Sequence, residues 1–317
     1  MALTTYPVQW QEWFVNQLVQ KNNMIAQGLV QLDTTLIGAE KRVRTPIFKS
    51  LSTLGNAPST RAAGNTLTTQ ALTDTSELAP VINRWDGIYN YGITAELQGK
   101  DALEMLKYQI PEVVSRDIQN ALYSLTKGAF VSALTSHTYN ALTESAPSTT
   151  ISYELLNVAA QHVLGETMTN LTAVVMNSKS LTDAINKGMA TWTSSAGYDL
   201  ATGGRLAQMF GMKVITNDTL CASYTSGENT IYPVFLVGGT PWKIQWQKNL
   251  SYELYRIPTT DQNNLIWHYS FSPSIPGTSY IDATDTPTNI ELLTATFTKT
   301  AENDSDIKLV KIETVGA

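Results

Sequence analysis

Apolar residues follow a single helical stripe between residues 111 and 133. Val114, Ile118, Leu122, Leu125 and Ala129 recur at three- or four-residue spacing, which is the period of an α-helix with one buried face. Pro111 stands at the start of this stripe, where a first-turn proline is tolerated because its missing N–H would be unsatisfied anyway. We therefore predict one long helix of about 24 residues and about 36 Å, onto which other elements pack.

Two shorter helices are predicted on either side of this long one. Residues 8–21 place Trp10, Phe14 and Leu18 on one face, as in an N-terminal arm that packs against another element. After a Ser/Thr/Asn-rich linker at 135–150, Ser152 is suited to cap a helix that Gly165 would end.

The part of the chain beyond residue 165 alternates short apolar strands with one helix. This order predicts a compact α/β unit, followed by two paired strands around a turn and by a last strand. The predicted segments are a strand at 173–176, a helix through 181–185, strands at 213–216 and 232–237, the strand pair 251–256 and 265–271, and a strand at 307–312.

The segment 41–95 is predicted to form one very long, polar β-hairpin. Its outgoing limb is 41–49, where apolar residues such as Val43 and Ile47 are separated by charge, and its return limb is 81–93. The residues between them, 52–78, are dominated by Gly, Pro, Ser, Thr, Asn and Asp, which bury too little apolar area for a core of their own. Such a loop is typical of a protein that lays an arm over its neighbour; a disordered insertion in an ordinary domain is the alternative.

Composition narrows the classes of function. The chain of 317 residues is 43% hydrophobic, enough for two modest cores, and has no apolar run long enough for a membrane helix. Residues 1–7 lack the basic and apolar regions of a signal peptide, and the single cysteine excludes an internal disulfide. The net charge is −6 and 15% of residues are charged, so the sequence has no overall positive charge to hold nucleic acid tightly. A DNA partner would therefore be enclosed by the protein rather than recognised by its base sequence.

No pattern of catalytic or metal-binding residues is found. His137, His162 and His268 lack metal-ligand spacing and have no cysteine partner beyond the lone Cys221. The motifs of serine hydrolases, zinc proteases and phosphate-binding loops are missing. We therefore expect no catalytic residues, no cofactor, no metal and no enzymatic activity.

The order of elements and several local motifs resemble the major capsid proteins of tailed bacteriophages, which have the Hong Kong 97-type capsid fold. The segments that carry the resemblance are RTPIFKSL (44–51), VVMNS (174–178), FGMKVITND (210–218), FLVGG (235–239), WHYSFSPSIPG (267–277) and TPTNIEL (286–292). The resemblance implies an α+β fold with an N-terminal arm, an extended β-hairpin loop, a long spine helix, a peripheral domain and an axial domain. It implies these bounds: arm 1–40, extended loop 41–96, spine helix and first part of the peripheral domain 97–164, axial domain 165–245, and return to the peripheral domain with the C-terminal strands 246–317.

The resemblance also implies a function and its partners. The protein would self-assemble, as hexamers and pentamers, into an icosahedral shell around double-stranded phage DNA contacted without sequence specificity. Scaffolding and portal proteins would be separate chains, no membrane would be involved, and the shell would assemble in the host bacterial cytoplasm and end in the virion. An encapsulin-type nanocompartment shell is the alternative, and a phage tail or adhesin module is a further one.

The residues expected to contact neighbouring subunits lie in the arm and around the extended loop. A basic group at the root of the loop can be either a solvated strand face or such a contact. The candidates are Trp10, Trp13, Lys41, Arg42, Arg44, Lys49, Arg61 and Arg84. Relatives that cross-link covalently use a loop lysine with an asparagine and a glutamate; Lys49 has no recognisable partners, so we expect no cross-link.

Overall fold

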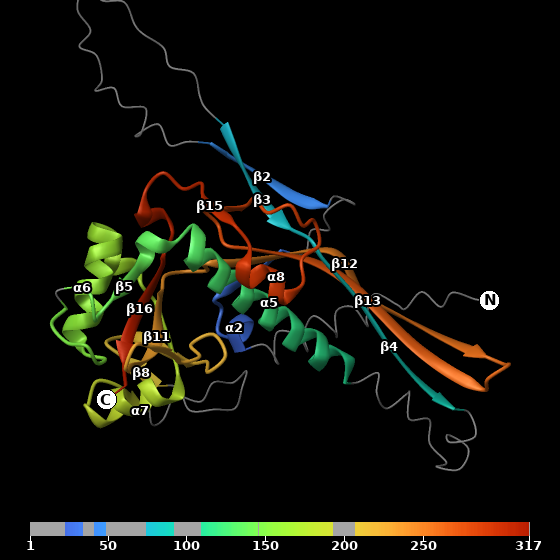
Figure 1. The fold of residues 1–317 in the computed structure, drawn as a ribbon, viewed down its shortest axis with the longest axis horizontal. Helices are drawn as coiled ribbons and strands as arrows, with labels where there is room; N and C mark the ends of the chain where they lie inside the picture. The colour runs from blue at the N-terminus through green and yellow to red at the C-terminus, as the bar shows by residue number, and fades with distance from the viewer. Residues whose placement is uncertain are drawn as a thin grey trace, which may run out of the picture.

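The computed structural model describes residues 23–33, 41–48, 74–91, 109–144, 146–192 and 207–316. These residues form an α+β fold with two main sheets, two small two-stranded sheets and a few helices. Figure 1 shows a body at one side and a long, narrow group of strands that leaves it at the other. No helix among these residues is long and apolar enough to cross a membrane.

The body is built on a sheet that collects strands from distant parts of the chain. Its order is β5-β16-β11-β6-β9-β8-β7, with β10 paired to β11 outside this path. Every residue of the central strand β6 is buried, because β11 and β9 flank it and helices cover the sheet. The strands are β5 (Thr138–Asn140), β6 (Ala173–Met176), β7 (Thr191–Trp192), β8 (Ala207–Met209), β9 (Met212–Thr216), β10 (Tyr224–Ser226), β11 (Asn229–Val237) and β16 (Leu309–Val315).

Two helices of the body have side-chain caps, and α6 begins and ends as the sequence predicts. In α6 (Tyr153–Leu164) the Ser152 hydroxyl accepts the Leu155 N–H at 3.1 Å, and Gly165 follows the helix with φ of 53°. In α7 (Ser178–Asn186) the Asn177 side chain accepts the Lys179 N–H at 2.8 Å. A short 3₁₀ turn, η3 (Gly165–Asn170), leads from α6 to β6.

The prediction of a linker at 135–150 is wrong for the first half of this segment, which contains regular secondary structure. A 3₁₀ turn, η2 (Thr135–His137), leads directly into β5, and β5 pairs in parallel with β16. Three residues of strand are too short to show a period, and their partner lies far away in the sequence.

The predicted spine helix is present as α5 (Ile110–Ser132), with Pro111 in its first turn. Its buried stripe includes the residues named above and belongs to a core that joins both main sheets. The short helix α8 (Asn289–Thr294) crosses it closely. A Cβ on Gly128 would lie 2.1 Å from the carbonyl oxygen of Leu292, so only glycine allows this approach.

The strands that leave the body form a four-stranded sheet of order β1-β12-β13-β4. It consists of β1 (Val30–Asp33), next to the short helix α2 (Asn23–Ala26), with β4 (Ile82–Tyr91), β12 (Trp242–Ile257) and β13 (Gln262–Ser274). The predicted pairing of 251–256 with 265–271 is confirmed, with Ser251 opposite His268. Its covered face, which includes Leu265 and Phe271, packs in the core that contains α5 (Figure 1).

The extended hairpin has its predicted outgoing limb but a different return limb. β2 (Arg42–Phe48) pairs with β3 (Asp74–Pro80), and not with 81–93. The segment predicted as the return limb forms β4, which pairs with β13 along its whole length. Apolar residues of β4, such as Ile82, are buried in the main core. β3 is more polar, so it can form a hairpin limb that lies outside this core.

Two small elements lie against the base of the hairpin. β14 (Thr278–Tyr280) pairs with β15 (Phe297–Lys299), and a 3₁₀ turn, η4 (Asp304–Asp306), follows. The domain bounds implied by the resemblance stay a prediction; β5 and β16 join the sheet of 165–245 from outside those bounds.

Candidate functional site

The base of the hairpin is held by hydrogen bonds with the segment 275–300, each of which involves at least one side chain. The Leu78 N–H donates to the Ser279 hydroxyl at 3.0 Å. Glu77 Oε1 accepts two bonds, from the Gly277 N–H at 2.6 Å and from the Thr300 hydroxyl at 2.9 Å. These bonds fix the direction in which β2 and β3 leave the body.

Glu77 is the charged residue at the centre of this contact. Burial raises the pKa of its carboxyl above the ordinary 4.5, while the hydrogen bonds from Thr300 and Gly277 and the charge of Lys243 act in the opposite direction. Sequence reasoning missed Glu77, because its partners lie about 200 residues further along the chain.

Arg42 holds the other side of the base. Its guanidinium donates to the Asp282 carbonyl oxygen at 2.6 Å, lies 3.1 Å from an oxygen of Asp285, and stands over the ring of Tyr280 at 5.5 Å from the centroid. The Lys41 ammonium reaches the other Asp285 oxygen at 3.2 Å. Hydrogen bonds from Lys41 and Arg42 lower the pKa of Asp285.

Arg84, on the covered face of β4, is also engaged within the subunit. It donates to Asn289 Oδ1 at 3.0 Å and lies 3.5 Å from an oxygen of Asp117. The same Asp117 accepts the Tyr269 hydroxyl at 2.8 Å, and burial raises the pKa of that hydroxyl. Arg84 therefore connects β4 to α5 and to the start of α8.

The other predicted contact residues differ in how much the structure says of them. Arg44 is exposed on β2 and makes no ion pair within the described part of the chain. The Lys41 side chain is 81% exposed despite its ion pair. Trp10, Trp13, Lys49 and Arg61 lie outside the described residues.

Exposed aromatic side chains gather on one face of β4. Trp85, Tyr89 and Tyr91 are 81%, 59% and 45% exposed, and their odd positions place them on the face opposite to the core. The Tyr89 and Tyr91 rings contact edge to face at 5.6 Å. Tyr255, in the same cross-strand row as Tyr89, is exposed as well. We call these four residues the aromatic face.

The aromatic face has the character of a contact surface. Tryptophan and tyrosine are over-represented among the residues that dominate protein interfaces, and β4 is an edge strand. Asn264 stands between Tyr89 and Tyr255, and its buried Nδ2 has no hydrogen-bond partner among the residues described. The sequence of 81–93 predicts a strand, but only the position of α5 decides which face stays uncovered.

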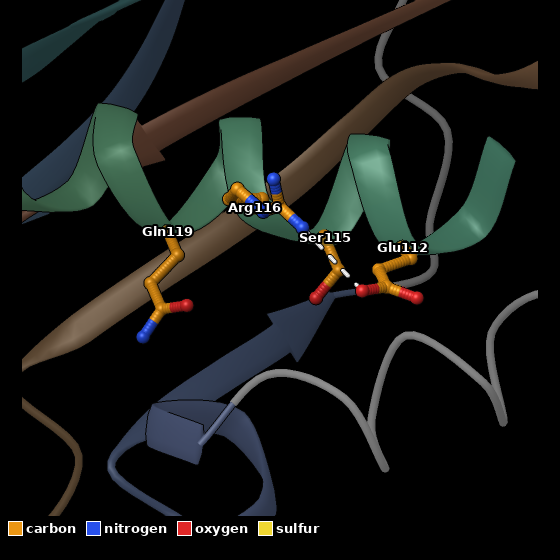
Figure 2. Close-up of a pocket in the computed structure, with 4 residues that line it drawn as sticks. All are labelled: Glu112, Ser115, Arg116 and Gln119. Carbon is orange, nitrogen blue, oxygen red and sulfur yellow. Dashed lines mark hydrogen bonds and ion pairs between the residues drawn. The ribbon is translucent and has the colours of Figure 1, made fainter. Parts of the chain in front are cut away.

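A polar pocket of about 270 Å³ lies along α5 (Figure 2). It is lined by Glu112, Ser115, Arg116 and Gln119, and Arg116 pairs with Glu112 at 3.4 Å one turn away. Figure 2 shows all four side chains coming from successive turns of this one helix. The Glu112 carboxylate, which could serve as a base, is paired with Arg116, and the pocket lining suggests no reaction.

The histidines and the cysteine have structural surroundings. His137 is fully buried, with Nδ1 2.9 Å from the Leu309 carbonyl oxygen and Nε2 3.1 Å from Asp304 Oδ1. Burial raises the pKa of the Cys221 thiol, which disfavours the reactive thiolate. Within the described ranges, no three His, Cys, Asp or Glu residues are placed to hold a metal ion.

Ser251 and His268, both among the described residues, form a contact of the kind found in catalytic Ser-His pairs. The Ser251 Oγ lies 2.7 Å from His268 Nε2 on neighbouring strands. Among the described residues no carboxylate bonds the other ring nitrogen, and burial lowers the pKa of the ring. The pair joins the neighbouring strands β12 and β13.

Comparison with known proteins identifies the fold through structure alone. No family model and no curated protein matches the sequence. The head protein of Helicobacter pylori bacteriophage KHP40 matches 94% of this chain and 91% of its own at 9% identity, with a TM-score of 0.59. The chain has the Hong Kong 97-type capsid fold.

Two other solved structures share this capsid fold over most of their length. The capsid of cyanophage Pam1 matches 94% of this chain and 93% of its own at 13% identity, with a TM-score of 0.58. An encapsulin from Synechococcus elongatus, solved as a holo complex, matches 99% of this chain and 89% of its own at 11% identity, with a TM-score of 0.54. The predicted α+β capsid fold is therefore confirmed, and the contact residues stay a prediction.

Proposed function

We propose that this protein is the major capsid protein of a tailed bacteriophage, which assembles into a closed icosahedral shell around double-stranded DNA. The observation that carries the proposal is the match of nearly the whole chain to phage capsid structures. The protein acts as a structural component, without a catalytic role.

The physical basis is the repetition of modest contacts by symmetry. A closed lattice multiplies each subunit contact many times, so a stable particle needs no single strong interface. In the proposed shell the axial domain 165–245 forms hexamers and pentamers. The arm 1–40 and the extended loop 41–96 lie over neighbouring subunits.

The residues proposed to contact neighbours fall into two groups. Arg44 and the exposed ammonium of Lys41 are available at the hairpin, while Arg42 and Arg84 set the directions of β2 and β4 from within the subunit. The aromatic face supplies apolar area on the edge of the four-stranded sheet. Trp10, Trp13, Lys49 and Arg61 stay candidates on the basis of the sequence.

The proposed partners follow from this role. The DNA is enclosed and contacted non-specifically, which suits a chain with a net charge of −6. A scaffolding protein and a portal protein are separate chains, and assembly takes place in the bacterial cytoplasm before the virion is complete.

A second candidate is the shell of an encapsulin-type nanocompartment. The match to the Synechococcus elongatus encapsulin, which extends over 99% of this chain, favours it. Such a shell would enclose a cargo protein instead of a genome. The capsid fold supports neither the tail nor the adhesin alternative.

The test is electron microscopy of the purified full-length protein, expressed with and without candidate scaffolding proteins. Closed particles support both shell proposals; their nucleic-acid content, measured by the ratio of absorbance at 260 and 280 nm and by nuclease treatment, separates capsid from nanocompartment. A protein that stays monomeric at high concentration under all these conditions contradicts both.

A pair of variants tests the aromatic face. Trp85→Ser combined with Tyr89→Ser is expected to lower the yield of particles while the subunit keeps its thermal stability, because both side chains are already exposed in the subunit. Ile290→Ser is the matched control, since Ile290 is 78% exposed on α8. Equal yields from the double variant, the control and the wild type would show that the aromatic face lies outside the contacts.

A further inference from the structure

A cavity of about 380 Å³ lies between the C-terminal half of α5 and the strands β10 and β11. Its walls are mostly apolar, and Phe130 and Phe235 contact each other there edge to face at 5.4 Å. Val131, Leu220 and Pro233 complete the apolar lining. This size falls in the range of small-molecule binding pockets, which combine apolar walls with few polar groups.

Two lysines line the same cavity, and their charges are balanced differently. The Lys311 ammonium lies 2.7 Å from Glu313 Oε1 and near the ring of Tyr224, whose hydroxyl also bonds Glu313. The Lys127 ammonium instead donates to the neutral carbonyl oxygen of Thr219 at 2.9 Å. It makes no ion pair with any carboxylate of the described ranges.

Lys127 is therefore a cation beside an apolar cavity, with no compensating carboxylate among the residues that the structure describes. Partial burial, together with the charge of Lys311, lowers the pKa of Lys127, so its ammonium is partly removed from water, although its hydrogen bond to Thr219 lies at the surface. An anion at the mouth of the cavity would relieve this, because a partly desolvated ammonium pairs more strongly than a fully hydrated one.

We propose that this cavity binds a small amphipathic anion, an unbranched alkyl chain that ends in a carboxylate. The chain packs against Phe130, Leu220 and Phe235, and the carboxylate accepts hydrogen bonds from Lys127. A concave cavity of this volume fits a free small molecule better than a protein segment, which would need a longer and more open groove. The site is additional to the proposed shell function and does not depend on it.

The test is calorimetric titration of the full-length protein with octanoate, decanoate and 1-octanol. Octanoate should bind about tenfold more tightly than 1-octanol, because it adds a charge-assisted hydrogen bond to the same chain. Decanoate should bind about 15-fold more tightly than octanoate, since it has two more methylenes and each methylene that leaves water gains about fourfold. The absence of decanoate binding at millimolar concentration would overturn the proposal.

Three variants locate the binding site. Lys127→Gln should lower the affinity for octanoate to that for 1-octanol and leave the affinity for 1-octanol unchanged. Ala222→Trp, at an exposed position of the lining, should abolish binding of both by filling the cavity. Lys213→Gln is the matched control, an exposed lysine on β9, and should change nothing.

Two results of these titrations would contradict the assignment. Decanoate binding that persists at full strength in both Lys127→Gln and Ala222→Trp places the ligand elsewhere. Binding of a capped Leu-Leu-Asp tripeptide without binding of decanoate would mean that the cavity receives a protein segment. Circular dichroism and thermal unfolding verify that each variant is folded.

Discussion

Glu77 is predicted to hold the base of the extended hairpin on the body of the subunit. The substitution Glu77→Ala removes the acceptor of the Gly277 N–H and of the Thr300 hydroxyl, and it leaves both donors without their partner. A hydrogen bond to a charged group contributes about 1.5–3 kcal/mol. Because Glu77 is only partly buried, we discount the pair to about 2 kcal/mol in total.

A loss of about 2 kcal/mol corresponds to an opening equilibrium about 30-fold more favourable. Hydrogen exchange followed by mass spectrometry on the isolated subunit should therefore show amides of β2 and β3 exchanging about 30-fold faster in Glu77→Ala. Glu77→Gln keeps an oxygen acceptor in place and should change exchange less than about threefold. Glu253→Ala is the matched control, an exposed glutamate on β12.

The pH dependence of the same exchange provides an independent check. The folded-state pKa of Glu77 is raised above 4.5, so the closed hairpin binds the proton more tightly than the open one. This contribution to protection is complete below pH 4.5 and is lost as the pH rises through the raised pKa. The decline should disappear in Glu77→Gln. If Glu77→Ala exchanges no faster than Glu253→Ala, the carboxylate does not hold the hairpin.

Three further predictions concern the spine helix, the hairpin charges and Lys49. Gly128→Ala should lower the free energy of unfolding, measured in urea, by about 1–3 kcal/mol, because the new methyl group overpacks against Leu292. This loss should outweigh the gain of about 1 kcal/mol that alanine brings to a helix. An increase in stability would show that α8 moves aside without cost. Arg44→Glu should reduce the yield of particles and leave the free energy of unfolding of the subunit unchanged within about 0.5 kcal/mol. Arg42→Glu should reduce the yield and also speed hydrogen exchange in β2. Identical behaviour of the two variants would contradict the distinct roles of the two arginines. Mature particles boiled in detergent should release a single band near 34.8 kDa, while a ladder of larger bands would reveal cross-linking through Lys49.

Local features of the chain are those that the sequence predicts well. The stripe of α5, the Ser152 cap and Gly165 end of α6, and the pairing of β12 with β13 each depend on residues close together in the chain. Helical periodicity, capping and tight turns act over a few residues, so their signals survive without knowledge of the rest of the fold.

The tertiary structure alone decided the partners of the strands and the roles of the side chains between them. The residues of 81–93 favour a strand whether it pairs with β2 or with β13, and Trp85 is equally apolar on either face. Arg42 was predicted from its charge, but its partners Asp282 and Asp285 lie about 240 residues away. Strand pairing and burial are set by the free energy of the whole core, and that free energy depends on contacts between residues distant in sequence.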